Sequence, residues 1–132
     1  MKEVIDSRFL IEHLYSDKAE VKHKTSKRLR ELIRRKEGLL PTIVICEIVR
    51  IVCEKLGKEV AETCYLSLIG SGLQIKDLDQ NIAKRAGLLK CQHSNVPVGD
   101  CIIASTAMAN QARVLSDDPH YDVMKGVKRC WI

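Results

Sequence analysis

The sequence predicts an α/β domain in which helices cover both faces of a mostly parallel sheet. Short apolar segments of strand length alternate with longer segments in which apolar residues recur at helical spacing. The 132 residues fit one domain, and no Gly/Ser- or Pro-rich linker divides them. Hydrophobic residues make up 45% of the chain and aromatic residues only 4%, so the core must consist of Ile, Leu, Val and Ala. We therefore expect a single three-layer α/β/α domain over residues 1–132 with a central sheet of four or five strands.

The first half of the chain opens with strand, turn and helix. A strand over Glu3–Asp6 is followed by an apolar pattern with the spacing of one helix face, from Phe9 to Leu14. Glycines that end helices and a proline that begins one mark the next boundaries. The expected elements are the helix Thr25–Lys36, the strand Leu39–Pro41, and the helices Thr42–Leu56 and Lys58–Ile69. The helix that begins at Thr42 is apolar nearly all round, which predicts that it is buried.

The second half continues the alternation. Leu73–Lys76 alternates as a strand does, and Asp79–Gln92 has the pattern of an amphipathic helix. Asn95–Gly99 is expected to be a loop. A helix rich in small residues and two more strands complete the prediction, over Asp100–Gln111, Arg113–Ser116 and Val127–Ile132.

The net charge of +5 is concentrated in the segment Lys22–Lys36, in which Glu31 is the only acid. With Leu29, Leu32 and Ile33 facing inward, the basic residues form an outer helix face that attracts phosphate. A solvated surface is the ordinary alternative for such a face. Together with a metal site, the face becomes a plausible track for nucleic acid. The candidate contacts are Lys24, Lys27, Arg28 and Arg30.

Neither a membrane span nor a signal peptide is recognisable, because no apolar run is long enough. We therefore expect a cytoplasmic protein without a membrane partner. The cysteines form no C-x-x-C pair and most of them lie in apolar segments, which favours buried thiols over zinc or disulfides. A hyperthermophilic source would make a disulfide an alternative. The cysteines are Cys46, Cys53, Cys64, Cys91, Cys101 and Cys130.

Acidic residues stand where apolar elements expose one end. Asp6 follows the first strand, Glu47 interrupts an apolar helix, Asp100 begins a helix, and Asp117 and Asp118 follow a strand. Ligands of parallel sheets bind beyond the carboxyl ends of the strands, near the point where strand order reverses. We therefore expect these carboxylates to converge.

Each acid also has a structural alternative. Asp6 and Asp100 are suited to cap the helices that begin beside them. Glu47 has Arg50 as its only polar neighbour one turn away, so an ion pair between them is the alternative there. At least one of the two aspartates before Pro119 is expected to have a role in a turn.

Converging carboxylates repel one another, and a divalent cation resolves this conflict. Mg²⁺ and Mn²⁺ prefer oxygen ligands and retain waters that can attack phosphorus. No Ser-His-Asp set, P-loop or dinucleotide fingerprint competes with this interpretation. A phosphoaspartyl transferase would need an acid at Arg8, and a receiver domain would pair acids where Asp6 is followed by Ser7.

Four segments carry these acids in a fixed order: Val4–Ile11, Thr42–Glu47, Gly99–Ala107 and Val114–Tyr121. In this order the chain resembles the PIN-domain family of metal-dependent ribonucleases, and specifically its small VapC-like members. The resemblance implies metal ligation by four acids, with a further contact through water from either member of the last acidic pair. The four are Asp6, Glu47, Asp100 and Asp118, and the additional acid is Asp117.

The resemblance also covers the surroundings of these acids. Ser116 matches a small hydroxyl residue two positions before the last acid, and the Ser-x-Asp spacing favours Asp118 over Asp117. Arg8 departs from the family, in which a small polar residue is usual. A long cation there would occupy the site mouth, bind phosphate or hinder metal binding. Arg8 and Ser116 are therefore further candidate contacts to nucleic acid.

The family resemblance implies an endoribonuclease with one or two Mg²⁺ or Mn²⁺ ions. It further implies a parallel sheet with flanking helices, a homodimer, and in many members a toxin role opposed by an antitoxin that covers the acidic site. The alternative hypothesis is a catalytically silent PIN-like module that binds RNA or a protein through the basic face. A structure-specific DNA nuclease is a third hypothesis with the same chemistry.

Overall fold

A five-stranded sheet, parallel throughout, forms the centre of the computed structural model, which describes residues 1–132. Its strand order is β3-β2-β1-β4-β5. The predicted α/β class with a mostly parallel sheet is confirmed. The strands are β1 (Glu3–Ile5), β2 (Gly38–Pro41), β3 (Gln74–Lys76), β4 (Arg113–Leu115) and β5 (Arg129–Cys130).

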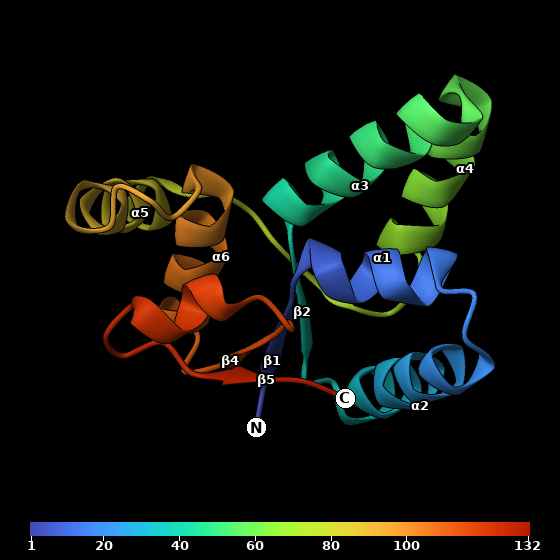
Figure 1. The fold of residues 1–132 in the computed structure, drawn as a ribbon, viewed down its shortest axis with the longest axis horizontal. Coiled ribbons are helices and arrows are strands. Elements are labelled where there is room, and N and C mark those ends of the chain that lie inside the picture. Colours follow the sequence, from blue (N-terminus) through green and yellow to red (C-terminus); the bar gives the residue numbers. More distant parts are fainter.

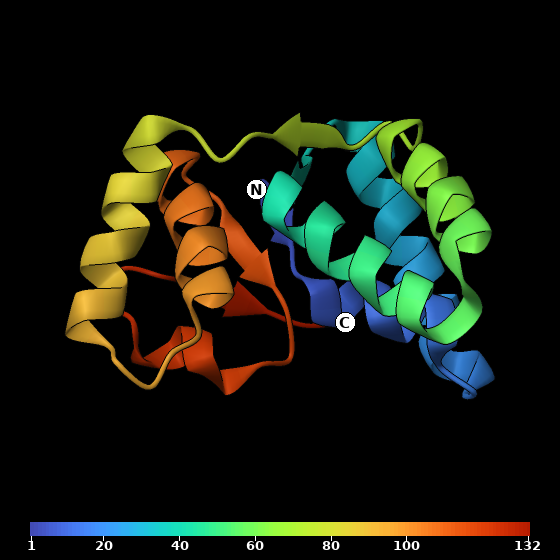
Figure 2. The same cartoon turned by 90° about the horizontal axis from the view of Figure 1, so that it is seen from above.

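Helices cover both faces of this sheet. Figures 1 and 2 show α1 to α4 on one side of the strands and α5 and α6 on the other. None of the helices combines the length and the apolar character needed to cross a membrane. The helices are α1 (Ser7–Tyr15), α2 (Ala19–Arg35), α3 (Thr42–Leu56), α4 (Lys58–Ile69), α5 (Gln80–Gln92) and α6 (Val98–Ala109), and a 3₁₀ helix, η1, spans Pro119–Val123.

Most strand ends and some helix ends differ from the sequence prediction by one or two residues, and three differences are larger or bear on the site. Helix α2 begins at Ala19 rather than Thr25, since its first turns are polar and carry little apolar periodicity. Helix α6 begins at Val98, directly after Pro97, rather than at Asp100. The segment after β4 contains η1, which no periodic pattern signalled, because one turn is too short to show a period.

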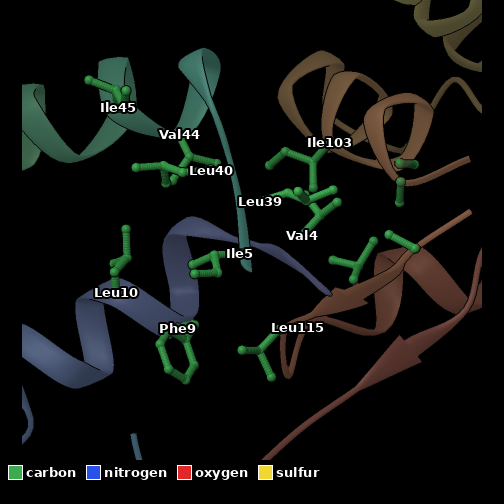
Figure 3. Close-up of a cluster of buried hydrophobic side chains, with 14 of the residues drawn as sticks. Val4, Ile5, Phe9, Leu10, Leu39, Leu40, Val44, Ile45, Ile103 and Leu115 are labelled. Atoms are coloured by element: carbon green, nitrogen blue, oxygen red, sulfur yellow. The ribbon is translucent and has the colours of Figure 1, made fainter. Parts of the chain in front are cut away.

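The hydrophobic core lies on both faces of the central strands (Figure 3). Val4 of β1 pairs in register with Leu39 of β2, and neither is exposed to solvent. Strands of a parallel sheet are covered on both faces and therefore read as continuous apolar runs. The core is mostly aliphatic, as the composition predicts, although Phe9 and Tyr121 are the largest fully buried side chains.

The prediction that α3 is buried all round is wrong. Val44, Ile48 and Val52 face the core, whereas Cys46 and Cys53 are exposed on the opposite face. The prediction of buried cysteines is also wrong for half of them. A small apolar residue in a helix does not reveal whether its side chain points to the core or to solvent. Cys46, Cys53 and Cys91 are exposed, Cys64 and Cys130 are partly buried, Cys101 is buried, and all six are free thiols.

The chain reverses its direction across the sheet between β1 and β4. From β1 it passes to β2 and β3 on one side, then returns through α5 and α6 to β4 on the other side. Ile5 and Leu115 are partners at the carboxyl ends of β1 and β4. Asp6 and Ser116, which follow them, therefore lie at the switch point where parallel sheets bind ligands.

Candidate metal centre

Asp6 is the buried acid at this switch point. It caps α1, accepting a hydrogen bond from the amide of Ser7 at 2.9 Å, as the capping alternative predicts. Its other contacts face the site: the hydroxyls of Ser116 and Tyr121 donate to its two carboxylate oxygens. Burial raises the pKa of Asp6 from 3.8 to about 6, and the nearby charge of Asp100 contributes in the same direction.

Ser116 is fully buried and serves as a link between two acids. Its hydroxyl donates to Asp6 and accepts a hydrogen bond from the amide of Asp118 at 3.0 Å. The Ser116 hydroxyl is thus already engaged by two groups of the site, and its contact with nucleic acid stays a prediction.

Asp100, Asp118 and His120 form a group in which one ligand atom from each lies within 4.8 Å of the others. The Nδ1 atom of His120 lies 2.9 Å from Asp100 Oδ2 and 3.2 Å from Asp118 Oδ1. Asp118 also caps η1 through the amide of His120, so it combines the expected turn role with a place in the site. Burial raises the pKa of Asp100, and the charge of Asp118 contributes in the same direction, opposed by His120.

Asp100 does not have the capping role that was its alternative. Pro97 is the residue before the first turn of α6, and the Asp100 carboxylate contacts side chains instead of backbone amides. One of these is Tyr121, whose hydroxyl lies 3.1 Å from Asp6 Oδ1 and 3.4 Å from Asp100 Oδ1. Burial and the charges of both carboxylates raise the pKa of Tyr121, so its hydroxyl keeps its proton and bridges the two acids.

Glu47 lies at the edge of this group. Its carboxylate accepts a hydrogen bond of 2.6 Å from the hydroxyl of Ser7, next to Asp6. It also approaches α6, since a Cβ atom added at Gly99 would lie 3.2 Å from Glu47 Oε2. The alternative of a Glu47–Arg50 ion pair is wrong, because Arg50 pairs with Glu54 on the exposed side of α3.

Arg8 and Asp117 form an ion pair beside the acids. The Arg8 Nε atom lies 2.5 Å from Asp117 Oδ1, and the Arg8 side chain is 55% exposed. The hydrogen bond that Arg8 donates to Asp117 raises the pKa of Arg8, and the charges of Asp117, Asp118 and Asp6 contribute. Of the two adjacent aspartates, Asp118 therefore joins the group with Asp100, while Asp117 faces the cation.

The basic residues of α2 fall into two kinds: one contacts a buried carboxylate, and the others lie on the surface. Arg28 reaches the buried carboxylate of Glu3 at 2.9 Å, and Arg113 contacts the same carboxylate from β4. Glu3 begins β1, so this clamp lies at the amino edge of the sheet, opposite Asp6. Lys24 pairs with Glu20 on the surface, and Lys27 and Arg30 are exposed without an ion pair. Arg28 thus has a structural role that competes with its expected contact to nucleic acid.

Sequence reasoning did not select Ser7, His120 or Tyr121 as site residues. Each lies within three positions of a predicted acid along the chain, which is the only signal that the sequence offers. Their contacts depend on the turn after β4, where η1 brings consecutive side chains against Asp6 and Asp100.

The donor set fits a divalent cation. Carboxylate oxygens are the ligands that Mg²⁺ and Mn²⁺ prefer. Burial, with a smaller contribution from the neighbouring carboxylate, raises the pKa values of Asp6 and Asp100, and a bound cation would offset both effects. Asp100 and Asp118 would hold it, with Asp6 and Glu47 alongside. Fold and site together define an α/β/α domain with a carboxylate-lined centre at the switch point of its sheet.

The chain belongs to the PIN domain family, since residues 4–127 match that family. No match is found among curated proteins.

Solved structures of VapBC systems have the same fold. The structure of VapBC2 from Rickettsia felis bound to a DNA fragment from its promoter has a TM-score of 0.79 and 17% identity, covering 100% of this chain and 99% of that chain. DNA-bound VapBC from Salmonella typhimurium has a TM-score of 0.78 and 15% identity, covering 99% of this chain and 98% of that chain. VapC20 of Mycobacterium tuberculosis, a toxin that cleaves the sarcin-ricin loop, has a TM-score of 0.69 and 13% identity, covering 89% and 91%. At these identities the likeness shows the fold alone.

Proposed function

We propose that this chain is an endoribonuclease that hydrolyses RNA phosphodiester bonds with one or two Mg²⁺ or Mn²⁺ ions. The observation that carries the proposal is the meeting of Asp100 and Asp118 within ligand distance at the switch point of a PIN domain. Buried Asp6 is tied to Asp100 through the Tyr121 hydroxyl. The proposed ligands are Asp6, Glu47, Asp100 and Asp118, with Asp117 in contact through water.

The chemistry of the site follows from this arrangement. A bound divalent ion supplies an activated water and neutralises the charge that builds on the phosphate. Asp100 and Asp118 hold their oxygens toward a common point, while Ser116 and Tyr121 fix the carboxylate of Asp6. Arg8 at the mouth offers a guanidinium group to a phosphate of the substrate, which it would share with Asp117.

Two observations favour RNA as the substrate class. VapC20, which shares the fold, is described as cleaving the sarcin-ricin loop. In addition, Lys27 and Arg30 on α2 remain exposed and unpaired, so their charges are free to contact a phosphate backbone. Lys24 contributes if it leaves its surface pair with Glu20.

The same comparison supports a role as the toxin of a toxin–antitoxin pair. Several structures with this fold are VapBC or FitAB complexes. We infer that an antitoxin protein covers the acidic centre of this chain, that the chain forms a homodimer, and that it acts in the cytoplasm.

The Arg8–Asp117 pair favours the second hypothesis, a silent PIN-like module that binds RNA or a protein. A cation held beside the acids attracts phosphate, yet it also competes with a metal ion for the same negative charge. This hypothesis predicts RNA binding without cleavage.

The test combines metal binding with cleavage. Thermal melting across a Mn²⁺ titration should raise the melting temperature of the wild type, because a ligand of the folded state stabilises it. Asp100→Asn should lose most of this rise and all cleavage of a mixed RNA pool, whereas the exposed control Asp77→Asn should keep both.

The outcomes separate the hypotheses. A melting rise without cleavage of RNA favours the silent module, and cleavage of structured DNA in place of RNA favours a DNA nuclease. Cleavage that persists in Asp100→Asn contradicts the assigned centre.

A further inference from the structure

His120 places a nitrogen donor inside the group of carboxylates. Its Nδ1 atom lies 2.9 Å from Asp100 Oδ2 and 3.2 Å from Asp118 Oδ1. The imidazole is 45% exposed, so its opposite edge faces solvent while Nδ1 faces the acids. The site therefore differs in donor chemistry from one built of oxygens alone.

Local backbone geometry fixes this placement. Asp118 accepts a hydrogen bond of 2.9 Å from the amide of His120, which ties both residues into the first turn of η1. The next residue, Tyr121, is fully buried and contacts Asp6 and Asp100. Buried Tyr121 on one side of His120 and the Asp118 cap of η1 on the other side hold the imidazole beside the carboxylates.

The distances are those of neighbouring ligands on one ion. Adjacent donors of an octahedral ion with bonds of about 2.1 Å are about 3 Å apart. Nδ1 stands at this separation from one oxygen of Asp100 and one of Asp118. Imidazole binds a metal ion through the lone pair of a ring nitrogen, and Nδ1 is the nitrogen that contacts both carboxylates, so it would be the donor to an ion held between them.

We propose that His120 is a direct ligand of the metal ion and makes this centre selective for Mn²⁺ over Mg²⁺. The inference rests on the proposed metal-dependent function and specifies its cofactor. Mg²⁺ is bound through oxygen ligands and water, whereas imidazole binds first-row transition ions. An Asp100, Asp118 and His120 set consequently strengthens Mn²⁺ binding more than Mg²⁺ binding.

Pulsed electron paramagnetic resonance of the Mn²⁺-loaded full chain tests the nitrogen ligand directly. We expect a coupling from directly bound ¹⁴N that changes when histidine is labelled with ¹⁵N. His120→Ala should abolish the coupling, whereas His23→Ala, at an exposed position of α2, should retain it. His120→Asp should also lack the coupling, while it replaces nitrogen by oxygen.

Calorimetric titrations supply the second readout. Loss of the imidazole in His120→Ala should weaken Mn²⁺ binding by about tenfold or more and change Mg²⁺ binding much less. His120→Asp should reverse the preference toward Mg²⁺. Because the side chain is nearly half exposed, both variants are expected to fold, which circular dichroism checks.

Each result decides between the proposals. Mn²⁺ binding with no ¹⁴N coupling, or an unchanged ratio of Mn²⁺ to Mg²⁺ affinity in His120→Ala, overturns the role of His120 and leaves the carboxylate centre standing. A wild type that binds neither ion overturns both this inference and the proposed metal-dependent function.

Discussion

Replacing Asp6 by asparagine should stabilise the metal-free protein at neutral pH. The Asp6 carboxylate is buried, and its pKa in the fold is about 6 against an ordinary value of 3.8. Each pH unit between the two values corresponds to about 1.4 kcal/mol, so the ionised carboxylate destabilises the fold by about 3 kcal/mol. Asparagine removes the charge but fits the donors Ser7, Ser116 and Tyr121 less well, at a cost of about 1 kcal/mol. We expect a net gain of about 2 kcal/mol.

The pH dependence gives the sign of this effect. Folded Asp6 keeps its proton to a higher pH than unfolded Asp6, so the folded state binds more protons between about pH 4 and pH 6. The contribution of Asp6 to stability is therefore fully present below this window and is lost as the pH rises through it. The advantage of Asp6→Asn over the wild type should grow across the window and level off above it.

Urea unfolding in the presence of EDTA measures both quantities. The free energies of unfolding of wild type and variant are compared from about pH 4 to about pH 8, where other titrating groups cancel in the difference. Asp77→Asn, an exposed aspartate changed in the same way, is the matched control and should show no growing difference. If the difference in free energy of unfolding between Asp6→Asn and the wild type does not change with pH across the window, the argument that burial raises the pKa of Asp6 is refuted.

Three further changes test other contacts. Gly99→Ala places a Cβ atom 3.2 Å from Glu47 Oε2, so the carboxylate must shift, and we expect a several-fold loss of cleavage measured on RNA with little change in melting temperature. Arg28→Ala removes two hydrogen bonds to buried Glu3, which should lower the free energy of unfolding by about 2 kcal/mol in urea. The double variant Lys27→Ala/Arg30→Ala should flatten the slope of log binding constant against log salt by up to about 1.4 for single-stranded RNA.

Each of these changes has a control within the chain. Gly87→Ala in α5 meets no atom within 4 Å and should leave cleavage unchanged, and equal activity of Gly99→Ala would place Glu47 outside the centre. The control for Arg28→Ala is Lys27→Ala, an exposed neighbour, which should keep full stability. If Arg28→Ala weakens RNA binding while the free energy of unfolding is unchanged, the structural role assigned to the Arg28–Glu3 contact is wrong. An unaltered salt slope in the double variant removes α2 from the binding surface.

The fold was accessible from the sequence because its signals are local. A parallel sheet buries its strands on both faces, so Val4-Ile5, Leu39-Leu40 and Val114-Leu115 read as short apolar runs between helical patterns. The predictions failed where a residue's facing depends on neighbours distant in sequence. Cys46 and Cys53 have the apolar character of their helix, yet both side chains are exposed.

The acids show the same division. Their positions at strand ends and in one helix indicated convergence, and Asp6 and Asp118 combine the predicted capping and turn roles with contacts in the centre. Sequence spacing did not reveal that Arg50 turns away from Glu47 to Glu54. It also did not reveal that Arg28 is used at the opposite edge of the sheet, where it neutralises Glu3.

The sequence by itself determined the class of fold, the family resemblance and which carboxylates stand at the ends of strands, because periodicity and the succession of elements along the chain are encoded in neighbouring residues. Only the tertiary structure decided how those carboxylates are partnered. Ser116 and Tyr121 reach Asp6 across more than a hundred residues of chain, and His120 reaches Asp100 from a different element. Such contacts depend on how β1, α6 and η1 pack together, and side-chain geometry across separate elements leaves no pattern in a single sequence.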